Sequence, residues 1–246
     1  MPYDKKPKMI LFDVGGTLFA GGKFSARNGL AALRLAALNP QDTTDDKLAL
    51  LWDEYSEKIG GGHKSPFGVT LDFPLSGALR YITMNAGLRF DISVAEQEEI
   101  FDRYNSDRKV IEGVTELLET IHSLSIRAAI ISNNAMSSEG LGLAIKHWIP
   151  EENMEFYLTS SDILLTKPCA DIFTTAANYA HLNPADCWYC GDSKRPDVDG
   201  AIGAGMTPIL LDVNSSAPYE YRTDADREYL VINHWNELTQ HLKKHF

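Results

Sequence analysis

Short apolar runs alternate with stretches of helical periodicity along this chain, mainly in its C-terminal half. The apolar runs fall at residues 9–12, 128–131, 156–159, 187–190, 208–211 and 229–232. Helical spacing covers residues 114–123 and 171–180, a stretch through Ala201, and the C-terminus. Such alternation is typical of parallel strands joined by crossover helices. We therefore predict an α/β fold with a Rossmann-like, doubly wound parallel sheet.

Residues 21–109 interrupt this alternation. Helical periodicity recurs within them at 30–38, 47–59, 76–86 and 93–104, with few strand-like runs. Without this segment 157 of the 246 residues remain, which is enough for one doubly wound core. We therefore predict a core made of residues 1–20 and 110–246, with an inserted α-helical domain at 21–109. The glycine-rich loop at 60–66 lies within the insertion.

The charge of the chain excludes some classes of partner. It carries 23 Lys and Arg against 34 Asp and Glu, which gives a formal net charge of −11. An acidic surface repels phosphodiester backbones and anionic membranes, so we expect neither nucleic acid nor a membrane as a partner. Residues 1–8 are polar, and Asp13 interrupts the apolar run that follows them. We therefore expect no signal peptide or membrane span, and a cytoplasmic location.

Two of the three cysteines, Cys187 and Cys190, form a C-x-x-C pattern that elsewhere binds zinc or carries out redox chemistry. Here the pattern falls inside an apolar run of strand length. Residues three apart on a strand point to opposite faces of the sheet, so these thiols cannot hold one ion or form one disulfide. We interpret both as reduced core residues.

Polar residues stand where the predicted strands end. Asp13 follows the first apolar run, Ser132 and Asn133 follow the second, and Asp192 comes just after the run at 187–190, with Asp197 five residues further on. The carboxyl ends of parallel strands meet at one edge of a sheet, which is where ligands bind in such folds. We therefore expect these side chains to lie close together.

Each of these residues could instead have an ordinary structural role. Asp13 and Ser132 could belong to turns or helix caps, Asp197 could be an N-cap, and Lys167 could be a surface cation. Together, however, three carboxylates at one edge would repel one another unless a cation lay among them. An oxygen-ligated ion such as Mg²⁺ meets that need, and with a nearby lysine and hydroxyl it suits a phosphoryl group. The carboxylate of Asp13 is then a candidate nucleophile.

The sequence resembles the haloacid dehalogenase superfamily in four segments. In chain order they are residues 12–18 (FDVGGTL), 130–133 (IISN), Lys167-Pro168, and 191–201 (GDSKRPDVDGA). The first and last together are specific, whereas an isolated Ser-Asn or Lys-Pro is not. The resemblance implies that the insertion at 21–109 is a C1-type helical cap. It also implies a flap hairpin that turns at Gly21 and Gly22.

The resemblance further implies a role for each matching residue. Asp13 would attack phosphorus to form an aspartyl-phosphate that water then hydrolyses, with Lys167 offsetting the negative charge. The cofactor would be Mg²⁺, and the substrate a small phosphorylated metabolite. The implied metal ligands are Asp13, the carbonyl of Gly15, Asp192 and Asp197. The implied phosphate-binding residues are Gly16, Ser132, Asn133 and Lys167.

One residue departs from the family pattern. Phosphatases of this superfamily usually carry a second Asp two residues after the nucleophile, as a general acid and base, and here that position is Gly15. Such a group contributes about 10²–10⁴-fold in rate. Three hypotheses follow: His63 or Lys64 of the glycine-rich loop supplies the acid, the substrate has a good leaving group, or the protein binds phosphate with little turnover.

Other chemistries of the same superfamily stay open. Haloacid dehalogenases share the nucleophile, Ser-Asn and Lys-Pro, but lack the acidic pair that Asp192 and Asp197 provide here. Phosphonoacetaldehyde hydrolases lack the second Asp and use a cap lysine, for which Lys23 and Lys64 are candidates. Cap residues would select the metabolite, so its identity is left open, as is the oligomeric state. Charge and position make five side chains plausible contacts for an anionic substrate: Lys23, Arg27, His63, Lys64 and Arg80.

Overall fold

The structure is a computed structural model that describes residues 2–59, 63–64, 70–71, 74–224 and 227–246. Its centre is a mostly parallel sheet. The strands of this sheet within the described residues are β1 (Met9–Phe12), β6 (Arg127–Ser132), β7 (Tyr157–Thr159), β8 (Cys187–Gly191), β9 (Thr207–Leu211), β10 (Tyr219–Asp224) and β11 (Arg227–Ile232). They lie side by side in the order β10-β11-β9-β8-β1-β6-β7, and only β10 with β11 is antiparallel. The predicted α/β, doubly wound fold is therefore confirmed.

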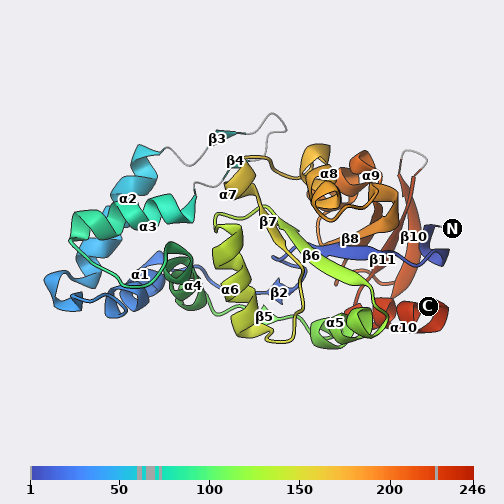
Figure 1. The fold of residues 1–246 in the computed structure, drawn as a ribbon, viewed down its shortest axis with the longest axis horizontal. Coiled ribbons are helices and arrows are strands. Elements are labelled where there is room, and N and C mark those ends of the chain that lie inside the picture. Colours follow the sequence, from blue (N-terminus) through green and yellow to red (C-terminus); the bar gives the residue numbers. More distant parts are fainter. Residues whose placement is uncertain (1, 60–62, 65–69, 72–73, 225–226) are drawn as a thin grey trace.

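Helices cover both faces of the sheet (Figure 1). One face carries α5 (Val114–Ser123), α6 (Ser138–Trp148) and α10 (Trp235–His245), and the other carries α8 (Ala170–Tyr179) and α9 (Gly200–Ala204). Side chains of β1 alternate between these layers: Ile10 and Phe12 join the first core, and Met9 and Leu11 join the second. None of the described helices is long and apolar enough to cross a membrane.

The two cysteines of the C-x-x-C pattern lie on β8, as predicted. Cys187 packs in the core beneath α8, whereas Cys190 packs in the core on the opposite face. Both are free and buried. Their interpretation as reduced core residues is therefore confirmed, and the pattern contributes no redox or zinc site.

The flap predicted at Gly21 and Gly22 is not a tight hairpin. The strand β2 (Phe19–Ala20) ends there, but it pairs antiparallel with β5 (Lys109–Val110), close to ninety residues further on. Gly22 has a positive φ of 97° and passes so close to Arg108 that a Cβ would lie 3.1 Å from the Arg108 backbone nitrogen. The glycines thus carry the chain out toward helix α1 (Ala26–Leu35), and the helical segment is inserted between the two flap strands.

Helices of the inserted segment lie together beside the sheet (Figure 1). They are α1, α2 (Asp45–Lys58), α3 (Leu75–Ala86) and α4 (Val94–Asn105). Their starts follow from sequence, because Ser25, Thr44 and Ser93 each cap a helix by accepting a bond from a backbone N–H. The helical prediction for this segment did not include two short strands: β3 (His63–Lys64) and β4 (Thr70–Leu71) pair antiparallel between α2 and α3.

A buried carboxylate joins the inserted segment to the core. Glu98 of α4 has no exposed surface and accepts hydrogen bonds from the backbone N–H and the hydroxyl of Ser137, at the start of α6. Burial raises the pKa of Glu98, and the bonds from Ser137 oppose that rise. The N-terminus of α6 is thus capped across the two parts of the chain.

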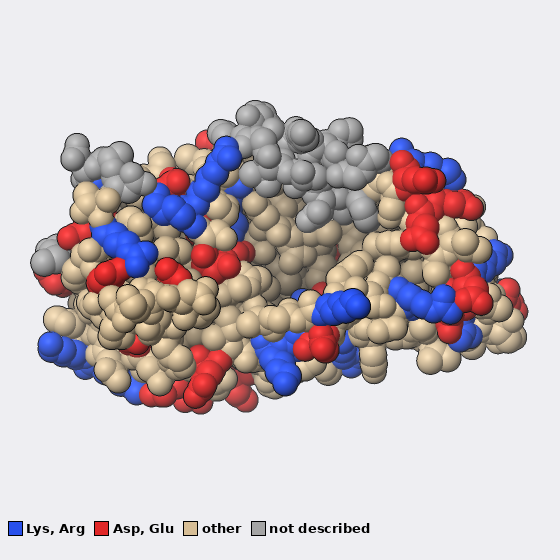
Figure 2. All heavy atoms as spheres, turned by 180° about the vertical axis from the view of Figure 1, so that it is seen from behind, with Lys and Arg blue, Asp and Glu red and all other residues tan. Residues whose placement is uncertain are grey.

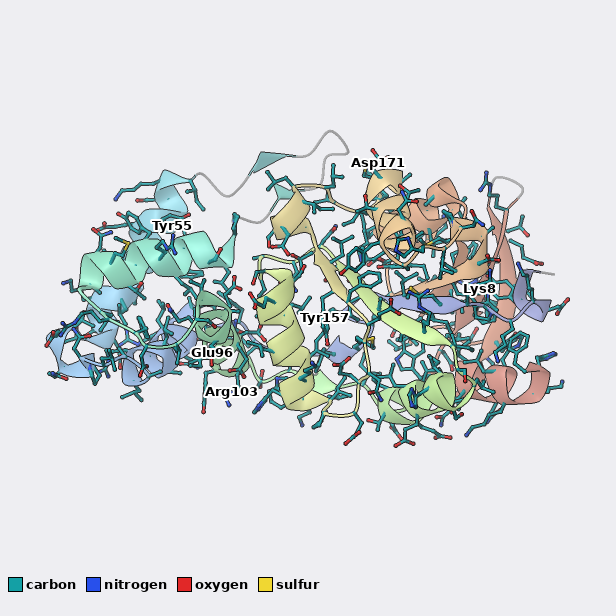
Figure 3. All side chains as sticks on the ribbon, viewed as in Figure 1. Lys8, Tyr55, Glu96, Arg103, Tyr157 and Asp171 are labelled. Carbon is teal, nitrogen blue, oxygen red and sulfur yellow. The ribbon has the colours of Figure 1, made fainter. Side chains whose placement is uncertain are left out.

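Strand β10 of the sheet and helix α6 beside it were not predicted. Strand β10 is an edge strand on which Glu220 and Arg222 alternate with tyrosines, so it lacks an apolar run. Helix α6 contains two glycines, which lower its intrinsic helix propensity. It forms because its apolar side packs on the sheet, where Tyr157 of β7 lies beside it (Figure 3). Tertiary packing therefore decides both elements.

Variants at two tryptophans test a hydrogen bond between the C-terminal helix and the loop after β1. Trp235 is fully buried, and its indole N–H donates to the carbonyl of Thr17 at 3.0 Å. Trp235→Phe leaves that carbonyl unpaired, so the free energy of unfolding should fall by about 1–3 kcal/mol in urea denaturation. In the described residues the indole nitrogen of Trp148 has no partner. Trp148→Phe should therefore cost less, and equal losses would contradict the prediction.

Candidate active site

Four predicted site residues meet at the carboxyl edge of the sheet. Asp13 follows β1, Ser132 ends β6, Asn133 follows it, and Asp192 follows β8. Because β1 lies between β6 and β8, these strand ends are neighbours in space. All four residues line one cavity of about 1000 Å³. Figure 2 shows a hollow in the surface between the part of the molecule that contains the sheet and the part that contains α1 to α4.

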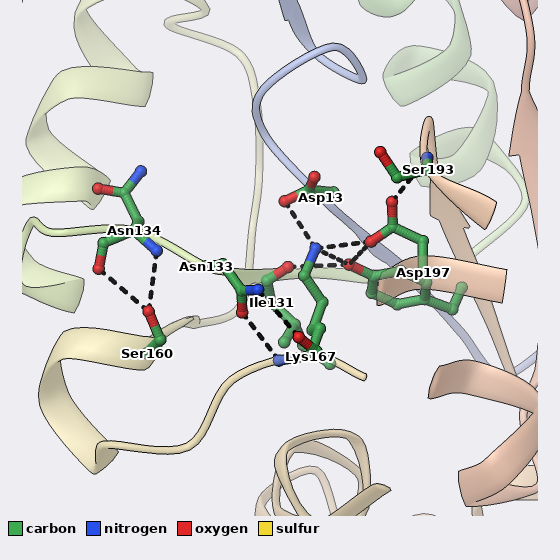
Figure 4. Close-up of polar contacts among 9 residues, drawn as sticks. Asp13, Ile131, Asn133, Asn134, Ser160, Lys167, Ser193 and Asp197 are labelled. Carbon is green, nitrogen blue, oxygen red and sulfur yellow. Dashed lines mark hydrogen bonds and ion pairs between the residues drawn. The ribbon is translucent and has the colours of Figure 1, made fainter. Parts of the chain in front are cut away.

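The side-chain amine of Lys167 lies at the centre of the cluster, between Asp13 and Asp197 (Figure 4). The residue is 1% exposed, and its Nζ lies 2.9 Å from Asp13 Oδ1 and 2.7 Å from Asp197 Oδ1. Burial disfavours the ammonium ion, but the two carboxylates outweigh this effect and raise the pKa of Lys167. Lys167 is therefore a charged group shared between two acids, rather than the surface cation that was its alternative reading.

Three neighbours fix Lys167 and Asp197 in place. The side-chain amide of Asn133 donates to the carbonyl of Lys167 at 3.1 Å and accepts from its backbone N–H at 2.8 Å. Tyr189 accepts a bond from Nζ at 2.8 Å and donates to the carbonyl of Ile131 at 3.0 Å. The backbone N–H of Ser193 donates to Asp197 Oδ2 at 2.9 Å. The amide of Asn133 is thus engaged in positioning Lys167.

The carboxylates form a set of oxygen donors. Asp13, Asp192 and Asp197 each offer an oxygen, and these three oxygens lie within 4.8 Å of one another. Burial raises the pKa of Asp192, and the charges of Asp13 and Asp197 raise it further. The ammonium ion of Lys167 carries one positive charge beside three carboxylates, so a net negative charge remains in the cluster. Carboxylate oxygens at this spacing fit the ligand preference of Mg²⁺.

The loop after Asp13 brings its backbone close to Asp192. Gly16 has a φ of +71°, and a Cβ there would lie 2.2 Å from Asp192 Oδ2. The N–H of Gly16 donates to the carbonyl of Phe19 at 2.8 Å, so the loop closes on itself. A Cβ on Gly15 would meet no atom within 4 Å. Both glycines line the cavity, and the space beside Gly15 is open.

Other residues singled out from the sequence lie elsewhere. Asp199 is exposed and pairs with Lys194, and Arg27 pairs with Asp46 on the surface of the inserted segment. The backbone of His63 and Lys64 forms β3, but their side chains lie outside the described part of the structure.

The sequence reasoning missed several residues of the site. Tyr189 is fully buried against Lys167, and a phenol inside an apolar strand is a signal that its hydroxyl has a partner. Asp102 and Arg108 line the cavity from the inserted segment and form an ion pair with each other. No sequence pattern points to that pair, because only the fold brings α4 over the sheet edge.

Comparisons with known proteins agree with this geometry. The model of a family described as haloacid dehalogenase-like hydrolase matches residues 69–211. A curated relative, glyceraldehyde 3-phosphate phosphatase from Methanopyrus kandleri, is 23% identical over 240 residues, covering 94% of this chain and 95% of the relative.

Two solved structures share the fold. The 2-haloacid dehalogenase from Pseudomonas syringae pv. Tomato DC3000 has a TM-score of 0.58 at 23% identity, covering 97% of this chain and 99% of its own. The HAD-hydrolase YfnB from Bacillus subtilis, bound to magnesium, has a TM-score of 0.54 at 18% identity, covering 97% and 100%.

Two adjacent glycines test the loop geometry. Gly16→Ala places a Cβ against Asp192 at a left-handed φ, so it should lower the free energy of unfolding by about 1–2 kcal/mol. Gly15→Ala is the matched control, because open space surrounds its Cβ, and it should stay within about 0.5 kcal/mol of the wild type. Urea denaturation of both variants measures the difference. A Gly15→Ala loss as large as that of Gly16→Ala would contradict the described loop.

Proposed function

Because the chain belongs to the haloacid dehalogenase-like hydrolase family, we propose that it is a Mg²⁺-dependent phosphatase acting on a small phosphorylated metabolite. One observation carries the proposal: Asp13 lies at the edge of a cavity, bonded to a buried lysine and grouped with two further carboxylates. A dianionic phosphoryl group can approach such a set only where a divalent cation offsets the acids. The named activity of the relative from Methanopyrus kandleri also supports a phosphatase.

The reaction would take place in two steps on Asp13. In the first, a carboxylate oxygen of Asp13 bonds to phosphorus, the bond from phosphorus to the alcohol oxygen breaks, and the alcohol leaves after taking a proton from water. In the second, the oxygen of a water molecule bonds to phosphorus, and the bond from phosphorus to the Asp13 oxygen breaks. The water gives one proton to solvent and keeps the other in the product, so the carboxylate of Asp13 and inorganic phosphate are released. Splitting the transfer in this way replaces one difficult step by two easier ones.

The neighbours of Asp13 would each do a specific task. Lys167, at 2.9 Å, would offset the charge that accumulates as Asp13 approaches phosphate. Ser132, at the end of β6, would donate its hydroxyl to a phosphoryl oxygen. Asn133 would act through Lys167, because its amide holds the backbone of that residue. Gly16 would provide close approach of the loop, since its N–H already bonds to Phe19.

Asp13, Asp192, Asp197 and the carbonyl of Gly15 would hold the Mg²⁺ ion. When bound, the ion would supply positive charge for the carboxylates and for the phosphoryl oxygens. Residues 21–109 would act as the cap over this site, with β2 and β5 as its connection to the core. The cap would choose the substrate and exclude water during transfer.

A haloacid dehalogenase is the second candidate, because the fold of such an enzyme resembles this one. The acidic set argues against it. Asp192 and Asp197 would repel the carboxylate of a haloacid unless they bound a cation, and dehalogenation by an aspartate needs none. The three grouped carboxylates therefore favour phosphoryl chemistry.

The first test is hydrolysis of p-nitrophenyl phosphate and acetyl phosphate, with Mg²⁺ and with EDTA. Both compounds, an aryl ester and an acyl phosphate, have good leaving groups, so the absence of an acid at Gly15 should not hide turnover. We expect metal-dependent hydrolysis that Asp13→Asn reduces to background. Asp199→Asn, at an exposed carboxylate of the same motif, is the control and should retain activity. Hydrolysis that survives in Asp13→Asn would refute the nucleophile.

A second test restores the missing acid. The open space at Gly15 admits a side chain, so Gly15→Asp should place a carboxyl group beside the leaving oxygen. The rate on an unactivated ester such as glycerol 2-phosphate should rise by up to about 10²–10⁴-fold, with little change for acetyl phosphate. Gly15→Asn has the same shape but cannot donate a comparable proton, so it should give no gain. Equal gains in both variants would contradict an acid–base cause.

A further inference from the structure

The wall of the cavity beyond Asp13 is rich in acids. In the described part of this wall, five carboxyl groups face one guanidinium, that of Arg108. The acids are Asp13, Asp102, Glu112, Asp192 and Asp212. A bound Mg²⁺ and the phosphoryl group would engage only the acids at the sheet edge. The part of the wall left for the alcohol portion of a substrate is therefore acidic on balance.

The guanidinium in this wall is already committed. Arg108 forms an ion pair with Asp102, whose side chain is 8% exposed, and its guanidinium carbon lies 5.0 Å from the centre of the Phe19 ring. The positive charge of an Arg held between a buried carboxylate and an aromatic face is largely compensated by them, so little of it acts on a further anion. A second anionic group of a substrate would have to displace Asp102 or remain unpaired.

The wall becomes apolar further along. A side cavity of about 380 Å³ shares Phe24, Asp102, Asn105 and Asn134 with the main cavity. It is lined by Trp52 and Phe101, whose rings stack with their centroids 5.3 Å apart. The space open to the alcohol portion thus passes from amides and a neutralised ion pair to aromatic carbon, without a free cation in its described residues.

We propose that the phosphatase selects esters whose alcohol portion is uncharged, with no carboxylate and no second phosphate. The proposal rests on the proposed function and specifies its substrate class. Hydroxyl groups of the alcohol would bond to the Asp102–Arg108 pair and to the amides of Asn105 and Asn134. Carbon would face the ring of Phe24. Glu112 would repel a second anion, and Asp212 would add less to this repulsion because Arg222 lies 3.7 Å from its carboxylate.

Matched pairs of esters test the selection. Phenyl phosphate and 4-carboxyphenyl phosphate differ by one carboxylate, as do glycerol 3-phosphate and 3-phosphoglycerate. We expect kcat/KM to be at least about tenfold higher for the uncharged member of each pair, as expected for one unpaired charge. Hydrolysis of both members with equal efficiency would overturn this inference alone. No hydrolysis of any ester would overturn the proposed function, and the inference with it.

A single variant should change the selection in a stated direction. Asp102→Asn keeps the shape of the side chain but leaves the charge of Arg108 free to bind an anion. The ratio of kcat/KM for the uncharged ester to that for the carboxylate-bearing ester should therefore fall by about tenfold or more. In the double variant with Arg108→Gln, the improved hydrolysis of the carboxylate-bearing ester should be lost. If Asp102→Asn had only enlarged the cavity, the improvement would persist in the double variant. An unchanged ratio in folded, active Asp102→Asn would refute the role of the pair.

Glu112→Gln provides a second variant if Asp102→Asn does not fold, because Glu112 is exposed and its replacement leaves the buried pair intact. Removing one repelling charge should lower the kcat/KM ratio of the uncharged to the carboxylate-bearing ester by about twofold. Activity on p-nitrophenyl phosphate, measured in parallel, reports whether each variant is folded. A ratio identical to that of the wild type in active Glu112→Gln would count against an electrostatic origin of the selection.

Discussion

The arrangement of the site depends on one buried ammonium ion shared by two carboxylates. Lys167 is 1% exposed, so its charge is tolerable only because Asp13 and Asp197 lie within 3 Å and Tyr189 accepts a further bond. Removing the ammonium ion would leave the buried carboxylate of Asp197 without its compensating charge. This requirement explains why Asn133, far from Lys167 in sequence, uses both ends of its amide to hold the lysine backbone.

Sheet topology supplies the rest of the constraint. Strand β1 lies between β6 and β8, so the loops that follow these three strands open at the same edge. In doubly wound sheets this is where ligands bind, because helices cover both faces and leave only the strand ends accessible. Asp13, the proposed nucleophile, can therefore lie beside a lysine that is more than 150 residues away in sequence. The left-handed turn at Gly16 then lets the loop approach Asp192 without a clash.

Sequence alone predicted the parts that local chemistry determines. Strand β1 and helix α5 were predicted to the residue, because each has a clear apolar period and a defined end. Asp13, Ser132 and Asp192 were found because they terminate apolar runs. Edge strand β10, glycine-containing α6 and the pair of Asp102 with Arg108 were not found, because β10 lacks an apolar run, two glycines weaken the helical signal of α6, and no motif marks an ion pair between residues six apart. Tyr189 was not found either, because its partner Lys167 is a tertiary neighbour.

The space at Gly15 and the wall at Asp102 act on the same part of a substrate. Gly15 supplies no acid to the leaving oxygen, which favours alcohols that stabilise negative charge by themselves. Enols and phenols do this by delocalisation into a planar group, and planar carbon suits the aromatic surface of Phe24, Trp52 and Phe101. A carboxylate on that group would face the acidic wall instead. The loop that follows the proposed nucleophile and the aromatic wall of the proposed cap therefore favour the same kind of ester.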